Sequence, residues 1–148
     1  MGTYLYCHLQ STFRKYQGVN LERPATYFSL NFVVWCHHQG FHGLANLALI
    51  PGSVGGAPIQ NIGAYGVEVA ERIEAVHVVH RHTGERACLS RDDCEFRYRD
   101  SLFKHAAGVQ WIITEVDFVL DRDAVVEANY PSLRARLSEA EVTHDAAL

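Results

Sequence analysis

The sequence predicts a small domain of the α+β class, because helical and strand patterns both occur and occupy separate parts of the chain. The clearest pattern is an alternating apolar run at residues 111–120, which is typical of a strand. Two further strands, at 75–82 and 85–89, flank a Thr-Gly turn and predict a hairpin. Helical spacing of apolar residues predicts helices at 28–39 and 132–141.

Turn and cap residues set the expected ends of these elements. Gly40 follows the first helix, where a C-cap glycine is expected. Shorter helical turns are expected at 68–74 and at 90–94, the latter with Ser90 as its N-cap, because acids gather at its start. Residues 1–24 show no clear period, and the sequence assigns them no role.

Alternation along the strand predicted at 111–120 divides its side chains between two faces. One face carries Ile112, Thr114, Val116, Phe118 and Leu120, and the other carries Ile113, Glu115, Asp117 and Val119.

The composition describes an ordinary globular protein of 148 residues, with 48% hydrophobic and 20% charged residues. A formal charge of −4 gives no electrostatic reason to expect nucleic acid or an anionic membrane as a partner. No apolar run approaches the roughly 20 residues that span a bilayer. The N-terminus lacks the pattern of a secretory signal, so a cytoplasmic location is expected.

The cysteines and histidines do not form a recognised metal-binding pattern. Cys7, Cys36, Cys88 and Cys94 are irregularly spaced, which favours free, mostly buried thiols. The histidine groups at 37–42 and 77–82 lack neighbouring ligands at a suitable spacing, so no metal site is expected. No GxSxG segment supports hydrolase chemistry.

The most distinctive stretch is a glycine-rich run at residues 47–66 that carries no charge. It holds five of the eleven glycines, interleaved with aliphatic residues. Glycine lets a backbone approach another group closely, and successive N–H groups in such turns can bind an anion. The run therefore indicates either a loop that cradles a phosphate-bearing cofactor or a tight crossing between strands. Neither standard nucleotide-binding fingerprint is present.

A second informative run, at residues 96–104, places basic residues between aromatic ones. Arginine presents a rigid fork of donors that suits carboxylates and phosphates. One hypothesis is an anion site in which Tyr98 and Arg99 contact the ligand. The alternative, which the run alone favours, is a structural ion pair between Arg99 and Asp100.

Taken together, residues 44–68 and the run Tyr98-Arg-Asp-Ser-Leu-Phe-Lys104 resemble the UDP-N-acetylenolpyruvoylglucosamine reductases, also called UDP-N-acetylmuramate dehydrogenases. The resemblance extends from about residue 30 to about residue 137. These are flavoenzymes of bacterial peptidoglycan precursor synthesis, and so of cell-wall formation, cell shape and cell division. The resemblance implies a partial FAD-binding domain of the vanillyl-alcohol-oxidase/PCMH-like α+β type.

The resemblance also implies roles for individual residues. Those expected to line FAD are Ile50, Pro51, Gly52, Val54, Gly55, Gly56, Ala57, Ile59, Gly63 and Ile113. Tyr65, Tyr98 and Tyr130 match tyrosines that contact the substrate. Arg99 matches the family's active-site arginine.

The reaction that the resemblance implies passes hydride from NADPH to FAD and then to the enolpyruvyl double bond of a UDP-sugar. FAD is therefore the expected cofactor and NADPH the co-substrate. Arg99 would stabilise the negative charge that develops beside the substrate carboxylate. Family members are usually monomers without nucleic-acid or membrane partners.

Parts of the family pattern are missing from this sequence. These are an upstream Gly-Ser-Asn phosphate loop, a downstream Asn-Ala-Gly-Ser-Phe-Phe segment with the proton-donating serine, and a C-terminal glutamate. Arg97 also stands where the family usually has a small residue. We expect 1–29 to be an unmatched segment from a shifted reading frame, 30–120 a partial FAD-binding domain, and 121–148 the truncated start of the substrate-binding region. Such a fragment is expected to have negligible turnover alone, and the alternative function is an incomplete flavin-binding remnant.

Overall fold

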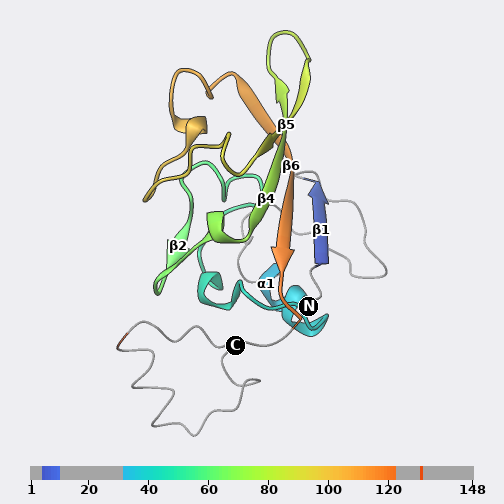
Figure 1. Ribbon diagram of the computed structural model, residues 1–148, viewed down its shortest axis with the longest axis vertical. Helices are drawn as coiled ribbons and strands as arrows, with labels where there is room; N and C mark the ends of the chain where they lie inside the picture. Colours follow the sequence, from blue (N-terminus) through green and yellow to red (C-terminus); the bar gives the residue numbers. More distant parts are fainter. Residues whose placement is uncertain (1–4, 11–31, 123–130, 132–148) are drawn as a thin grey trace, which may run out of the picture.

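The computed structural model describes residues 5–10, 32–122 and 131, and its centre is a four-stranded antiparallel sheet (Figure 1). The strands are β1 (Leu5–Gln10), β4 (Ile73–His80), β5 (Arg86–Ser90) and β6 (Trp111–Leu120), in the spatial order β1-β6-β4-β5. β2 (Gly63–Ala64) and β3 (Val67–Glu68) form a separate ribbon. Between residues 32 and 122 lie also the α-helix α1 (Val33–His38) and the 3-10 turns η2 (Ala45–Leu47), η3 (Val69–Glu71) and η4 (Leu102–Lys104).

The two predicted helices lie wholly or partly outside these ranges. The helix predicted at 132–141 lies outside the described residues, as do residues 28–31 of the first predicted helix. None of the helices in the described ranges has the length and apolar character that crossing a bilayer requires.

The N-terminal segment, to which the sequence assigned no role, contributes β1. Its backbone pairs with β6 from Leu5 opposite Leu120 to Gln10 opposite Glu115. β6 therefore has a partner on each side, β1 and β4, and is an interior strand of the sheet.

The hairpin predicted from residues 75–89 is confirmed as β4 and β5. The paired residues run from Ala75 opposite Ser90 to Val79 opposite Arg86. Gly84 in the connecting turn has a φ of 73°, in the left-handed region that glycine adopts without a steric penalty. The Thr-Gly signal thus marked the turn correctly.

The helical turn expected at 68–74 was wrong in extent. Residues 68–74 are divided between the end of β3, the three-residue η3 and the start of β4. Reciprocal side-chain to backbone hydrogen bonds between Glu68 and Glu71 form a capping box that begins η3. The turn expected at 90–94 is confirmed with Ser90 as its cap, because the Asp93 N–H donates to Ser90 Oγ at 3.3 Å and the Cys94 N–H donates to the carbonyl of Ser90 at 3.2 Å. Ser90 is the last residue of β5, and its hydroxyl donates to Asp93 Oδ2 at 2.6 Å, which is the main reason that the pKa of Asp93 is lowered.

The first helix begins after Phe32 and ends as predicted at Gly40. The Gly40 N–H donates to the carbonyl of His37 at 2.9 Å, and the next N–H, of Phe41, donates to the carbonyl of Cys36 at 2.8 Å. These bonds, with a φ of 73° at Gly40, form a Schellman motif. The Phe32 ring lies 5.4 Å from that of Phe118, so α1 packs on the sheet through the start of its apolar face.

The strand predicted at 111–120 has the predicted bounds, but its two faces do not run through its whole length. Opposite β4, the pairing passes from His77–Glu115 to Val78–Ile113, so Thr114 is an extra residue in a β-bulge. The Thr114 hydroxyl donates to the carbonyl of His77 at 3.2 Å.

This bulge reverses the alternation at the start of β6. Val116, Phe118 and Leu120 are fully buried, as one shared face requires. Before the bulge, Trp111 and Ile113 pack against the core instead, whereas Ile112 is 56% exposed. The predicted placement of Ile112 with Phe118 was therefore wrong, because alternation counts residues and a bulge adds one.

Three cysteines between residues 32 and 122 differ in their surroundings. Cys36 and Cys94 are buried, while Cys88 is exposed on β5. Burial, together with the nearby Asp93 carboxylate, raises the pKa of Cys94 from 9.0 to about 12.

We therefore expect Cys88 to react rapidly with iodoacetamide at pH 8 and Cys94 to react only after unfolding, because Cys94 stays a neutral, buried thiol. Alkylation followed by peptide mass spectrometry measures both sites. The unfolded thiol ionises near its ordinary pKa, so the free energy of unfolding should fall as pH rises from 9.0 to about 12. Modification of native Cys94 at the rate of Cys88 would contradict this placement.

Candidate functional site

Two tight turns bring tyrosines to the surface. The first joins β2 to β3, where Ala64 pairs with Val67. Tyr65 and Gly66 form its tip with φ values of 50° and 83°, the signature of a type I′ turn. Tyr65 is 51% exposed. A bulky residue in the left-handed region is uncommon, and such strain is a reason to look for function.

The second turn carries Tyr98 and Arg99, two further residues predicted to belong to the site. Arg97 and Asp100 each donate a backbone hydrogen bond to the other at 3.0 Å, which places Tyr98 and Arg99 at the tip. Tyr98 is 81% exposed, and the Arg99 guanidinium lies 5.6 Å from the centre of its ring. Arg99 has a φ of 54°. Both turns thus hold a strained, non-glycine residue at an exposed tip.

Arg99 is oriented by the glycine-rich run and not by Asp100. Its Nη2 donates to the carbonyl of Gly63. Asp100 instead lies 2.8 Å from His105 Nε2 and 3.8 Å from Lys104 Nζ, and the hydrogen bond from His105 is the main reason that the pKa of Asp100 is lowered. The ion pair between Arg99 and Asp100, which the run alone favoured, was therefore wrong.

Gly63 is needed at this point for its lack of a side chain. A Cβ atom there would lie 2.8 Å from the carbonyl oxygen of Val67 and 3.4 Å from Arg99 Nη1. The first separation is too short for a Cβ beside backbone. The close approach of the turn therefore depends on glycine, in addition to any contact of Gly63 with a cofactor.

Sequence reasoning missed two buried polar residues that join the two runs. Ser101 is 1% exposed and donates to the carbonyl of Ile59 at 2.5 Å. Asn61 is 0% exposed and donates to the carbonyl of Arg97 at 3.0 Å. Buried polar groups need such partners. No local pattern could have found them, because their partners lie 42 and 36 positions away in the sequence.

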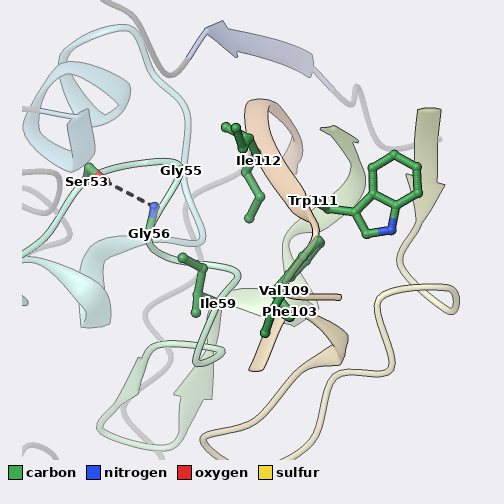
Figure 2. A pocket seen from close by; sticks show the side chains of 9 residues that line it. Ser53, Gly55, Gly56, Ile59, Phe103, Val109, Trp111 and Ile112 are labelled. Atoms are coloured by element: carbon green, nitrogen blue, oxygen red, sulfur yellow. Dashed lines mark hydrogen bonds between the residues drawn. The ribbon is translucent and has the colours of Figure 1, made fainter. Parts of the chain in front are cut away.

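A cavity of about 460 Å³ opens between the glycine-rich run and the start of β6 (Figure 2). Four residues predicted to line FAD are in its wall: Gly55, Gly56, Ile59 and Ile113. The wall residues that were not predicted are Ser53, Phe103, Val109, Trp111 and Ile112. The Gly56 N–H donates to Ser53 Oγ at 3.1 Å, the bond drawn in Figure 2, which tightens the loop.

The other residues predicted to bind the cofactor lie outside this wall. Pro51 and Gly52 are exposed, Ile50 and Val54 pack against the core, and Ala57 is buried within it. Their contacts with FAD stay a prediction. Tyr130, predicted to contact the substrate, lies outside the described residues.

No metal site is apparent in the part of the chain that the structure describes. No three or more His, Cys, Asp or Glu side chains there lie close enough together to hold an ion. His77 Nε2 instead lies 2.8 Å from Asp117 Oδ2, across β4 and β6.

Comparison with known proteins identifies the matched part of the chain. No protein-family model matches. A UDP-N-acetylenolpyruvoylglucosamine reductase of Pseudomonas fluorescens Pf-5 is 50% identical over 108 residues, and that of Ralstonia nicotianae is 48% identical over 109. These alignments cover 73% and 74% of this chain and 32% of each relative. This part of the chain is homologous to the UDP-N-acetylenolpyruvoylglucosamine reductases.

The structural comparison agrees with the sequence comparison. The crystal structure of UDP-N-acetylenolpyruvylglucosamine reductase (MurB) from Thermus caldophilus matches with a TM-score of 0.53 and 29% identity. The match covers 74% of this chain and 37% of that reductase. It confirms the predicted fold class, a partial α+β domain of the PCMH-like type. The chain spans about a third of the length of the reductases that it matches.

Proposed function

We propose that this chain forms the FAD-binding part of a reductase that uses NADPH to convert UDP-N-acetylglucosamine-enolpyruvate to UDP-N-acetylmuramate. The names of the relatives support the substrate and the reaction. The observation that carries the proposal is the bond from Arg99 to Gly63, because it fixes a cationic side chain to the loop that walls the cavity. A cytoplasmic, monomeric protein is part of the same proposal.

The cavity fits one portion of FAD. Ligand pockets commonly measure about 300–1,000 Å³ and are mostly apolar with a few polar groups. This cavity falls in that range, and its wall combines aliphatic and aromatic side chains with the bare backbone of Gly55 and Gly56. A Cβ atom on Gly56 would lie 3.1 Å from Ser53 Oγ, so a side chain there would crowd the wall. The residues present therefore suit a flat, largely apolar ring system.

The chain's own residues would bind and polarise the substrate. FAD, when bound, supplies the hydride chemistry. Arg99 presents a charged fork at the exposed tip of its turn, where it would stabilise negative charge that develops on the substrate's enolpyruvyl carboxylate. Tyr65 and Tyr98, exposed on the two turns, would contact the UDP-sugar and fix its orientation.

Flavin binding by the purified chain tests this proposal. After addition of FAD and gel filtration, we expect a yellow chromophore to elute with the protein. Gly56→Val should weaken FAD binding about tenfold or more, because overpacking a filled wall costs about 1–3 kcal/mol. Gln60→Val, at an exposed loop position outside the cavity wall, is the matched control. Equal FAD affinity in both variants would show that the cavity is not the flavin site.

A second candidate function is flavin binding without turnover. The cavity supports it, because the residues that line the cavity include neither Arg99 nor the exposed Tyr65 and Tyr98. NADPH oxidation that depends on the enolpyruvyl substrate separates the two functions. We expect the isolated chain to show negligible oxidation, and clear substrate-dependent oxidation would establish it as the complete catalyst.

A further inference from the structure

Asn61 occupies an unusual position at the end of the glycine-rich run. Its backbone has a φ of 44°, and its side chain is completely buried. Nδ2 donates to Glu68 Oε2 at 2.7 Å and to the carbonyl of Arg97 at 3.0 Å, while Oδ1 accepts the N–H of Ala70 at 3.0 Å. Both ends of the amide are therefore used.

Only an amide in this orientation satisfies these three partners. Nδ2 faces a carboxylate and a carbonyl, both of which accept hydrogen bonds, and Oδ1 faces a donor. Rotating the amide by half a turn would place like groups together at every contact. An aspartate at position 61 would keep the bond from Ala70 but would set its second oxygen against Glu68 and Arg97.

Two partners of Asn61 flank the turns that carry Tyr65 and Arg99. Glu68 is in β3, directly after the turn that carries Tyr65. The carbonyl of Arg97 also accepts the N–H of Asp100, the bond that closes the turn that carries Arg99. The Asn61 side chain therefore bonds to residues that flank both turns. Gly63, the acceptor for Arg99, is only two residues further along the chain.

We infer that Asn61 is a positioning residue that fixes the Arg99 turn relative to the Tyr65 turn. Its effect on substrate binding rests on the proposed function, whereas its effect on the turns does not. The geometry predicts that loss of the Nδ2 donor will break the hydrogen bond to the Arg97 carbonyl, while the hydrogen bond from the Ala70 N–H stays.

Amide hydrogen exchange of the flavin-free chain tests the inference with Asn61→Asp. We expect exchange at the Asp100 amide to become about tenfold faster or more, because a buried hydrogen bond is lost beside it. Exchange at the amides of Ala70 and of the core strand residue Val116 should stay within about threefold of the unsubstituted chain. Gln60→Glu makes the same amide-to-acid change one residue away on an exposed side chain and should leave all three amides unchanged.

Two further measurements keep the inference testable if Asn61→Asp does not fold. In the unsubstituted chain, the Asn61 side-chain protons should exchange slowly and show NMR contacts to both Glu68 and Arg97; rapid exchange would overturn the inference. The double variant Asn61→Asp/Glu68→Gln returns a donor to the pair and should recover part of the protection at Asp100. An unchanged Asp100 amide in folded Asn61→Asp would also overturn it.

Ligand binding then separates this inference from the proposed function. If the chain binds FAD, Asn61→Asp should keep FAD affinity within about threefold but weaken the flavin spectral response to the enolpyruvyl UDP-sugar about tenfold or more. An unchanged response would overturn the positioning role toward substrate. If the unsubstituted chain binds no FAD, the proposed function fails, and the exchange results alone decide the role of Asn61.

Discussion

Replacing Arg99 with alanine, in a full-length reductase that carries the same Tyr-Arg-Asp-Ser run, is expected to lower kcat about 10²–10³-fold. The guanidinium is held by the carbonyl of Gly63 and stacked near the Tyr98 ring, so it is already oriented before charge develops. A preorganised cation acts on the transition state more than on ground-state binding. Steady-state NADPH oxidation measures kcat, and the absorbance of protein-bound flavin measures cofactor retention.

Arg99→Lys is the matched variant for this prediction. Lysine keeps the charge but lacks the fork that lets one side chain bond Gly63 and a ligand carboxylate together. We therefore expect a loss of rate between those of the unsubstituted enzyme and Arg99→Ala, with flavin retained in both. A large loss of flavin with kcat per bound flavin unchanged would assign Arg99 to cofactor binding instead.

Replacing Phe118 with alanine is expected to lower the free energy of unfolding by about 3–5 kcal/mol. Phe118 is fully buried near the C-terminal end of β6, which has strands on both sides, and its ring contacts that of Phe32. Its loss leaves a cavity that the sheet cannot close. Urea unfolding followed by far-UV circular dichroism measures the change.

Ile112→Ala on the same strand is the control. Simple alternation puts Ile112 on the face of Phe118, whereas the bulge leaves it 56% exposed. We therefore expect Ile112→Ala to change the free energy of unfolding by no more than about 0.5 kcal/mol. A loss comparable to that of Phe118→Ala would show that β6 keeps one unbroken face.

Sequence patterns predicted the local elements of the fold well. The bounds of β6, the hairpin turn at Gly84 and the helix end at Gly40 all follow from spacing and backbone preference within a few residues. β1 could not be predicted, because its pairing with β6 joins segments more than a hundred positions apart. The bulge at Thr114 likewise depends on the partner strand, whose register is not written in β6 itself.

The candidate site was only partly predictable. The resemblance indicated Tyr65, Tyr98 and Arg99, and the structure places the last two on one tip with Arg99 bonded to the glycine-rich run. Composition could not indicate that Asn61 and Ser101 join the two runs, because polar residues in a loop are ordinarily exposed. Long-range hydrogen bonds made by Asn61, Arg99 and Ser101 hold the two runs together.

The bulge at Thr114 also couples the packing of the core to the position of the cavity wall. A register shift of β6 against β4 by one residue would move Val116 and Phe118 out of the core and would displace Thr114 from the bulge. Only one alignment of the strands is therefore compatible with a closed core. Ile113, on the cavity side of the bulge, is held in place by strand pairing and by core residues that do not line the cavity. Substitutions deep in the sheet should therefore displace the cavity wall and lower the selectivity of the cavity for its ligand.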